Sequence, residues 1–288
     1  MEKTLIIGGI AGGATTAARL RRRNENMEII IFEKGDYISY ANCGLPYYIG
    51  DIIKNRDALL LQTPQAMKNK FNIDVRVASE VIKILPEENK IIVKDLKTKE
   101  EYEESYDNLV IATGSSPIKP PIKGIENENI FVLWTVNDTD NIKKYIYEKK
   151  PKSVSIIGGG FIGLEMAENL HKLGLDVSLI EMQDQVMAPV DKEMANLIHE
   201  NMVNNNINLI LGDGVKEFHN KNGKTEIVLN SGKNILTDMV ILSIGIKPNS
   251  QIAADANIEL NERKGIVVNE YLQTSVKNIY AVGDVIGV

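Results

Sequence analysis

The single cysteine of this 288-residue chain is the residue best suited to redox or nucleophilic chemistry. Cys43 stands in the run Ser-Tyr-Ala-Asn-Cys-Gly-Leu-Pro-Tyr at 39–47. A lone thiol cannot form an internal disulfide, so its oxidised form would be a mixed disulfide, a persulfide or a sulfenic acid. We expect Cys43 to begin a helix with Asn42 as N-cap, where the helix dipole and free backbone N–H groups favour a thiolate. The alternative is a small buried cysteine that only packs.

A glycine fingerprint in the middle of the chain predicts a dinucleotide site. Gly158, Gly160 and Gly163 have the G-x-G-x-x-G spacing, with an apolar strand before them and a helix after them. Such glycines allow a tight turn, a close approach of the backbone to a pyrophosphate, and helix–strand packing. Glu181 ends the next apolar strand, where a carboxylate accepts ribose hydroxyls and repels a 2′-phosphate, which favours NADH over NADPH. The alternative for the glycines is a turn that is needed only for packing. The alternative for Glu181 is a solvated acid at the end of a strand.

A related pattern near the N-terminus lacks the middle glycine of the fingerprint. Gly8, Gly12 and Gly13 are present, but Ile10 occupies the middle position. Glu33 ends the second strand and is again a candidate ribose partner. This pattern predicts a second nucleotide site.

A third piece of the same kind lies at the end of the chain. The run Ile-Tyr-Ala-Val-Gly-Asp at 279–284 is an apolar strand that ends in Gly283 and Asp284. A carboxylate there can accept hydrogen bonds from the ribityl hydroxyls of a flavin, although Gly-Asp after a strand is more often only a turn. The two preceding nucleotide units favour the flavin interpretation.

These residues need a scaffold, and the chain repeats one pattern twice. Each copy has an apolar strand, a glycine turn, a helix, a second apolar strand that ends in an acid, and a later strand that ends in glycine. Strands are expected at 5–7, 29–33, 109–114, 154–157, 177–181 and 239–245, and helices at 14–23 and 163–173. Apolar strands that alternate with helices form parallel sheets covered on both faces. A run that alternates apolar and polar residues at 75–93 predicts antiparallel strands added to the first domain.

The predicted fold class is therefore α/β, with two Rossmann-like dinucleotide-binding domains, the second inserted into the first. Proline-rich crossings at 115–121 and 245–248 mark the boundaries. We expect a discontinuous first domain of residues 1–117 and 246–288, and an inserted domain of residues 118–245.

Composition narrows the functional class. A net charge of -6 argues against nucleic-acid binding, and 43% hydrophobic with 25% charged residues is typical of a globular protein. One cysteine excludes a disulfide-stapled secreted fold and suits a reducing cytoplasm. No apolar run approaches the length of a membrane span, and the three histidines have no metal-ligand spacing. We expect a cytoplasmic protein without a metal site.

The chain resembles the pyridine nucleotide-disulfide oxidoreductases, in the single-cysteine branch of coenzyme A disulfide reductases and NAD(P)H-dependent persulfide reductases. The resemblance covers the full length, and its motifs lie at 8–14, 39–47, 112–114, 158–165 and 280–284. An apolar residue at Ile10 is usual in this branch. The resemblance implies that FAD occupies the first domain and NADH, or NADPH, the inserted one, with the nicotinamide stacked on the flavin.

The motifs and the resemblance together indicate the cofactor-binding residues. In the first domain they are Gly8, Gly9, Ala11, Gly12, Gly13, Glu33, Lys34, Ala112, Thr113, Gly114 and Asp284. In the inserted domain they are Gly158, Gly160, Phe161, Ile162, Gly163, Glu165, Glu181 and Gly245.

The resemblance also implies a substrate site. The run 42–47 is similar to the coenzyme A branch, whereas single-cysteine NADH oxidases and peroxidases have serine directly before the cysteine. By resemblance, the face of the first helix that carries Thr15, Arg19 and Arg22 binds the coenzyme A phosphates. Ser39 and Asn42 lie nearer the thiol arm of the substrate. These substrate-binding residues are Thr15, Arg19, Arg22, Ser39 and Asn42. The alternative is a basic helix end that is solvated and stabilised by the helix dipole.

The resulting functional prediction is an FAD-dependent NAD(P)H oxidoreductase. It reduces a coenzyme A-type disulfide or persulfide through Cys43. One alternative is an NADH oxidase or peroxidase that uses a cysteine sulfenic acid, and another is a non-catalytic flavin-binding redox sensor or electron-transfer protein. Family members continue past the position of Val288 into a C-terminal dimerisation domain. We therefore expect a truncated chain, with a natural short form as the alternative. We expect the full-length protein to be a homodimer and this fragment to be monomeric.

Overall fold

The computed structural model describes residues 1–287, and these residues form two compact units. Unit 1 comprises Met1–Ala41, Leu60–Ser116 and the chain from Lys247 on. Unit 2 comprises Asn42–Leu59 and Pro117–Ile246. The junctions near 117 and 246 lie within one residue of the expected ones. Residues 42–59, expected in the first domain, pack with the second unit.

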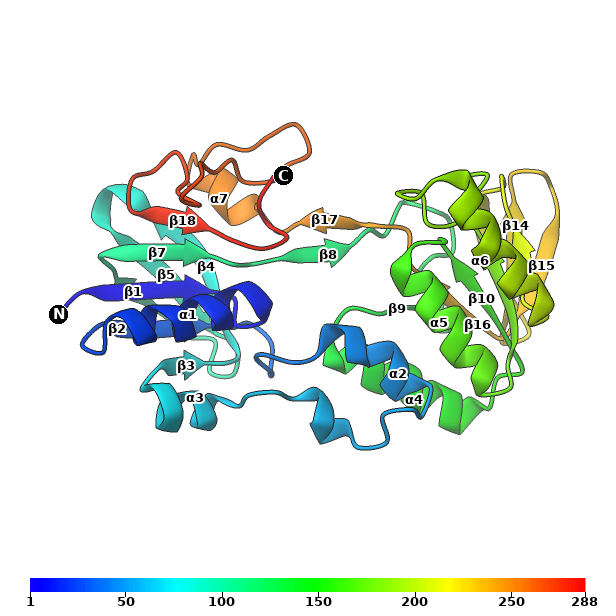
Figure 1. Ribbon diagram of the computed structural model, residues 1–288, viewed down its shortest axis with the longest axis horizontal. Helices are drawn as coiled ribbons and strands as arrows, with labels where there is room; N and C mark the ends of the chain where they lie inside the picture. The colour runs from blue at the N-terminus through cyan, green and yellow to red at the C-terminus, as the bar shows by residue number, and fades with distance from the viewer. Residues whose placement is uncertain (288) are drawn as a thin grey trace. The chain divides into compact units, whose positions relative to one another are not determined.

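Unit 1 is built on a five-stranded parallel sheet with the order β18-β7-β1-β2-β3 (Figure 1). The strands are β1 (Lys3–Ile7), β2 (Glu28–Phe32), β3 (Asp74–Arg76), β7 (Asn108–Ile111) and β18 (Ile279–Ala281). In the parallel register, Leu5 pairs with Ile30 on one side and with Leu109 on the other. The apolar runs therefore form the central strands.

Alternate side chains of these strands enter two different cores. Ile6 and Val110 pack on one face with Ala17 of α1 (Ala11–Arg23) and Met67 of α3 (Pro64–Phe71). On the other face, the antiparallel strands β4 (Ser79–Leu85), β5 (Lys90–Asp95) and β6 (Glu101–Ser105) cover the sheet.

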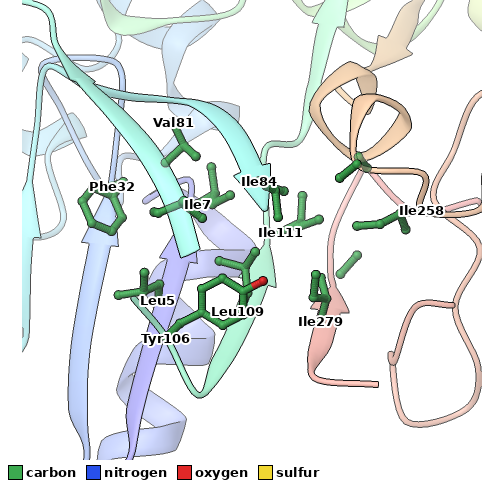
Figure 2. Close-up of a cluster of buried hydrophobic side chains, with 14 of the residues drawn as sticks. Leu5, Ile7, Phe32, Val81, Ile84, Tyr106, Leu109, Ile111, Ile258 and Ile279 are labelled. Carbon is green, nitrogen blue, oxygen red and sulfur yellow. The ribbon is translucent and has the colours of Figure 1, made fainter. Parts of the chain in front are cut away.

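Figure 2 shows the second of these cores. Val81 of β4 faces Ile7 and Phe32 of the parallel sheet, and Ile258 and Ile279 extend the cluster. The antiparallel strands expected in the first domain at 75–93 are present as β4 and β5, which form a sheet with β6, whereas β3, at the start of that range, joins the parallel sheet. The short helix α7 (Gln251–Asp255) packs beside β4.

Unit 2 repeats this plan. Its five-stranded parallel sheet has the order β12-β11-β10-β16-β9. The strands are β9 (Ile130–Val132), β10 (Ser153–Ile157), β11 (Asp176–Ile180), β12 (Asn208–Ile210) and β16 (Met239–Leu242). An antiparallel sheet of β13 (Val215–Lys221), β14 (Lys224–Leu229) and β15 (Asn234–Thr237) packs on it through Phe218 and Ile227.

Three longer helices belong to unit 2: α4 (Val136–Lys149), α5 (Phe161–Lys172) and α6 (Lys192–Asn204). A capping box fixes the start of α4, because the Thr135 hydroxyl accepts from the Asp138 N–H and the Asp138 carboxylate accepts from the Thr135 N–H. The helix α5 begins two residues earlier than expected, as the glycine turn leads directly into its first turn.

Residues 42–59 form a chain of short helical turns in unit 2. They comprise the 3₁₀ turn Asn42–Gly44, α2 (Leu45–Ile49) and the 3₁₀ turn Arg56–Leu59. Helix α2 packs against α4 and α5 (Figure 1). The connecting strands β8 (Ser115–Pro117) and β17 (Ile246–Pro248) pair with each other where the chain passes between the units.

The predicted fold class is confirmed: two parallel sheets each carry the strand–turn–helix–strand pattern of a Rossmann-like fold. Strand starts and ends differ from the expected ones by up to three residues. Within residues 1–287, no helix has both the length and the apolar character needed to cross a bilayer.

Candidate dinucleotide sites and the cysteine segment

The glycine turn of unit 2 is required in part by the protein's own packing. Gly158 has φ +106°, and a Cβ there would overlap the carbonyl oxygen of Ser243. A Cβ at Gly163 would overlap the carbonyl oxygen of Gly158, so this glycine lets α5 approach β10 closely. Gly160 differs, because its φ is -78° and an added Cβ would meet no atom of the described residues within 4 Å. The fold does not need glycine at Gly160, which leaves open space for a bound pyrophosphate.

Glu181, which follows β11, stabilises this turn by hydrogen bonds. Its Oε2 accepts a hydrogen bond from the Gly159 N–H at 2.6 Å, and its Oε1 accepts one from the Gln183 N–H at 2.8 Å. Each carboxylate oxygen has a second lone pair. Glu181 can therefore hold the turn and still accept hydrogen bonds from ribose hydroxyls.

Unit 1 reproduces the same construction despite Ile10. Gly8 has φ +102°, and a Cβ there would overlap the carbonyl oxygen of Ala112. The Oε2 of Glu33 accepts from the Gly9 N–H at 2.8 Å, and its Oε1 accepts from the Gly35 N–H at 2.8 Å. Ile10 is the N-cap residue of α1, as Gly160 is of α5. The N-cap position needs no glycine for folding in unit 2, where Gly160 occupies it. The same position is an isoleucine, Ile10, in unit 1.

The candidate cofactor residues gather at the carboxyl ends of the parallel strands in each unit. In unit 1, Gly8, Glu33, Ala112 and Asp284 follow β1, β2, β7 and β18. In unit 2, Gly158, Glu181 and Gly245 follow β10, β11 and β16. Ala11 and Gly12 begin α1 beside Gly13, while Phe161 and Ile162 begin α5. This edge is where ligands bind in open α/β sheets.

The remaining candidates of these sites differ in exposure. Lys34 is exposed just after Glu33, and Phe161 is 68% exposed at the start of α5. Glu165 is half-buried in α5, and the pKa of its carboxyl is raised by burial and by the neighbouring charge of Glu168. Gly114 has φ +63° with open space around it.

Two residues at the unit 1 site were missed by sequence reasoning. Ser115 is 5% exposed, and its hydroxyl donates to Asp284 Oδ2 at 2.9 Å and so orients that carboxylate. Asn249 accepts from the Thr113 hydroxyl at its backbone oxygen, 2.8 Å, and donates from its side chain to the Thr113 oxygen at 2.9 Å. Asn249 lies 136 residues from its partner, so no local motif marks it.

The basic end of α1 divides into one structural arginine and three exposed ones. Arg21 is buried, and its guanidinium donates to the backbone oxygens of Phe71 and Glu25 at 2.7 and 2.6 Å. Arg19 and Arg22 are exposed and make no hydrogen bond or ion pair with residues 1–287. Two free cations on one helix face can therefore bind a phosphate.

The other substrate candidates are split between the units. Thr15 is exposed on α1, and Ser39 is held in unit 1, where its N–H donates to the Gly9 oxygen at 2.9 Å. Asn42 is exposed beside Cys43 in unit 2.

The expectation that Cys43 begins an α-helix capped by Asn42 is wrong. Cys43 lies in a 3₁₀ turn, the N-cap of α2 is Gly44, and no side chain among residues 1–287 caps it. Pro46 explains the difference: it has no N–H, so it cannot make the first i→i−4 hydrogen bond to the Asn42 oxygen. The thiol precedes the helix, and it is exposed, not buried in packing.

The chain matches, over residues 2–288, the family model described as "Pyridine nucleotide-disulphide oxidoreductase". The chain belongs to this family. The family identification made from the sequence is confirmed, and FAD and NAD(P)H are the cofactors of the family and its solved neighbours.

Two curated relatives in this family are similar along almost the whole chain. An NADH oxidase of Methanocaldococcus jannaschii is 39% identical over 287 residues, and a coenzyme A disulfide reductase of Staphylococcus epidermidis is 37% identical over 286 residues. Each match covers 99% of this chain but 63% and 64% of the relatives. The chain therefore spans less than two thirds of the length of these proteins.

Solved structures of the family have the same fold. The crystal structure of reduced Bacillus anthracis CoADR-RHD has a TM-score of 0.96 and 51% identity, covering 99% of this chain and 51% of that one. A NAD-dependent persulfide reductase from A. fulgidus has a TM-score of 0.93 and 36% identity, covering 99% and 53%. Relatives of this chain thus include proteins named for sulfur substrates as well as an oxidase.

Proposed function

We propose that this chain is the dinucleotide-binding part of an NAD(P)H-dependent reductase of low-molecular-weight disulfides or persulfides, with coenzyme A as the preferred thiol. Unit 1 binds FAD at the carboxyl ends of β1, β2, β7 and β18. Unit 2 binds NAD(P)H at the Gly158–Gly163 turn, and Glu181 favours NADH. The observation that carries the proposal is an exposed lone thiol, Cys43, in a chain with two matching dinucleotide turns.

The chemistry balances with the groups named. FAD, when bound, accepts a hydride from NAD(P)H and passes two electrons to sulfur. The Cys43 thiolate attacks the disulfide, one thiol leaves as a thiolate, and a mixed disulfide with Cys43 remains. Two electrons and a proton then break that bond and release the second thiol. The sum is NADH, one disulfide and a proton converted to NAD⁺ and two thiols.

Residues of unit 1 support a coenzyme A-type substrate. Arg19 and Arg22 present unpaired guanidinium groups on the exposed face of α1, and a planar guanidinium binds phosphate through two hydrogen bonds. A disulfide without anionic groups would gain nothing from them. The names of the coenzyme A disulfide reductase and persulfide reductase relatives agree with this choice.

The deciding variant is Cys43→Ser, assayed for NADH-dependent reduction of coenzyme A disulfide. We expect that activity to fall by several orders of magnitude while NADH-dependent reduction of ferricyanide persists, because the dye takes electrons without the thiol. Disulfide reduction that survives in Cys43→Ser would refute the proposal and favour a flavoprotein in which the thiol has no chemical task.

An NADH oxidase or peroxidase is the second candidate, favoured by the 39% identical relative of that name. Such an enzyme would keep Cys43 as a sulfenic acid. Mass spectrometry of the oxidised chain separates the two: a coenzyme A adduct on Cys43 supports the reductase, and a single added oxygen supports the oxidase.

A further inference from the structure

One face of α4 contacts residues 42–59, called here the cysteine segment because they include Cys43. Asp140, Lys143 and Tyr147 lie three and four residues apart, so they share that face. Their partners on the segment are Tyr48, Asp51 and Arg56. Both sides of these contacts belong to unit 2. The segment is therefore docked on the helix by polar contacts as well as by apolar packing.

Lys143 is the centre of this docking. Its ammonium donates to the Tyr48 backbone oxygen at 2.5 Å and to Asp51 Oδ1 at 2.8 Å, and it lies 3.7 Å from the centre of the Tyr48 ring. The side chain of Lys143 is only 13% exposed. Carbonyl groups in the last turn of a helix have no partner within the helix, and a cation there is favourable. Lys143 thus caps α2 a few residues after Cys43.

Asp51 receives this cation in an unusual backbone conformation. Its φ is +60°, which non-glycine residues rarely adopt, and its Oδ2 accepts from the Tyr147 hydroxyl at 2.6 Å. Burial raises the pKa of Asp51, but hydrogen bonds from Lys143 and Tyr147 lower this pKa by more than burial raises it. The net shift is downward. The carboxylate is therefore ionised at neutral pH and available to Lys143.

The other side of α2 packs on α5. A Cβ at Gly50 would overlap the side chain of Asn169, which shows how closely the two backbones approach. Helix α5 begins at the Gly160 turn, the candidate dinucleotide site of unit 2. The cysteine segment thus rests directly on the helix that starts at that site.

The two ends of the segment return to unit 1 at one place. Tyr40 and Leu60 form an antiparallel bridge, and the Leu61 N–H donates to the Ser39 oxygen at 3.0 Å. Between these ends the body of the segment is held by α4 and α5. The orientation of α2, and of the exposed turn that precedes it, follows from that docking.

We propose that Lys143 is a positioning residue for the Cys43 thiol, which it acts on by fixing α2 to α4. The proposal rests on the proposed function, in which Cys43 is the redox thiol. Within residues 1–287, the hydrogen bonds of Lys143 are with Tyr48 and Asp51, so Lys143 acts on the thiol through the segment. Its removal should loosen the segment, so that Cys43 spends less time in the orientation needed to form and resolve a mixed disulfide.

The variants are Lys143→Met, Lys143→Arg and, as matched control, Lys144→Met, whose side chain is 69% exposed on the same helix. Hydrogen exchange of peptides from 42–59 is the first measurement. We expect Lys143→Met to raise exchange there by about tenfold, the size of one lost charge-assisted hydrogen bond, with α4 and the β10 strand unchanged. Lys143→Arg should restore part of the protection, and Lys144→Met should match the wild type.

The second measurement is kinetic. For the flavin-loaded chain, we expect Lys143→Met to lower kcat for coenzyme A disulfide about tenfold, in line with the same lost bond, while KM for NADH and the rate of ferricyanide reduction stay constant. A purely structural defect would lower the ferricyanide rate as well. Wild-type exchange and wild-type kcat in Lys143→Met would overturn the proposal.

Two further comparisons keep the test decisive. If Lys143→Met does not fold, Asp51→Asn removes the charge from the segment side and should give the same exchange and kcat pattern; a wild-type pattern overturns the proposal. If Cys43→Ser keeps disulfide reduction, the proposed function fails. The positioning role is judged separately by exchange and by the rate at which 4,4′-dithiodipyridine labels Cys43, which should differ between Lys143→Met and Lys144→Met.

Discussion

The carboxylate of Glu181 accepts a hydrogen bond from the Gly159 N–H at 2.6 Å, so the acid at the end of β11 holds the glycine turn after β10. Glu33 and Gly9 repeat this relationship in unit 1 at 2.8 Å. In both units the parallel register brings the ends of two neighbouring strands together. Each acid therefore shapes the loop that faces the candidate nucleotide while keeping lone pairs for a ribose.

Replacing Glu181 by glutamine should change nucleotide preference. The amide keeps an oxygen for the Gly159 N–H but removes the negative charge that repels a 2′-phosphate. We expect the ratio of kcat/KM for NADH to that for NADPH to fall about tenfold, or about 1.4 kcal/mol. Glu33→Gln is the matched control in unit 1 and should leave this ratio unchanged; an altered ratio there would contradict the assignment of unit 2 to NAD(P)H.

Alanine at two glycines of one turn should have opposite effects. Gly160→Ala places a methyl group in open space at an ordinary φ, so we expect wild-type thermal stability but at least tenfold weaker NADH binding. Gly158→Ala forces a Cβ onto the Ser243 oxygen at φ +106° and should lower the free energy of unfolding by several kcal/mol. Calorimetry and NADH titration measure both. Unchanged NADH affinity in Gly160→Ala would place the pyrophosphate elsewhere.

Asp238 should make unit 2 sensitive to acid. Burial raises its pKa, but hydrogen bonds from Lys224, from the Lys152 and Ser153 N–H groups and from the Ser153 hydroxyl lower it to about 2. A lowered carboxyl pKa stabilises the folded state above the unfolded value of 3.8, and this contribution is lost as pH falls toward 2. Asp238→Asn should cost about 2 kcal/mol at pH 7, and less at pH 3.

Urea unfolding at the two pH values checks this expectation. The control is Asp176→Asn, an exposed carboxyl of the same unit with no side-chain hydrogen bond to residues 1–287. A cost of Asp238→Asn that is the same at both pH values would mean that its charge does not contribute.

Ser115 should strengthen FAD binding by orienting the carboxylate of Asp284. Its hydroxyl donates to Asp284 Oδ2 at 2.9 Å, and without it the carboxylate would be free to rotate away from the ribityl hydroxyls. We expect Ser115→Ala to raise the dissociation constant for FAD by about five- to tenfold, as for one lost hydrogen bond to a charged group. Ser116→Ala, which loses a bond to Asn249 instead, is the control. Equal FAD affinity in wild type and Ser115→Ala would argue against Asp284 as a flavin ligand.

The exposed arginines of α1 should select for phosphate-bearing substrates. We expect Arg19→Ala with Arg22→Ala to raise KM for coenzyme A disulfide at least tenfold, because each guanidinium–phosphate contact is a strong charge-assisted bond. KM for 2-hydroxyethyl disulfide, which has no phosphate, should not change. Arg21→Ala should instead lower stability, since the buried Arg21 side chain donates to the backbone oxygens of Phe71 and Asn72. An equal rise in KM for both disulfides would remove coenzyme A from the proposal.

Much of the scaffold was predictable because its signals are local. The run at 154–157 is wholly apolar and the glycines after it are closely spaced, so β10, the turn and α5 follow from neighbouring residues. The repetition of the pattern predicted two sheets. The partners that orient the site were not predictable in this way: Ser115 contacts Asp284 across 169 residues. Such pairs depend on which strand ends the fold brings together.

The sequence by itself determined the family, the two glycine turns with their acids, and the presence of a single thiol, because each is encoded by residue type and short-range spacing. Only the tertiary structure decided where that thiol belongs. Residues 42–59 follow the first nucleotide unit in the chain, yet they pack with the second, since Lys143 binds Asp51 and the helix of Asn169 lies against Gly50. Those contacts join residues about a hundred positions apart, and such pairing depends on complementary surfaces that no local pattern specifies.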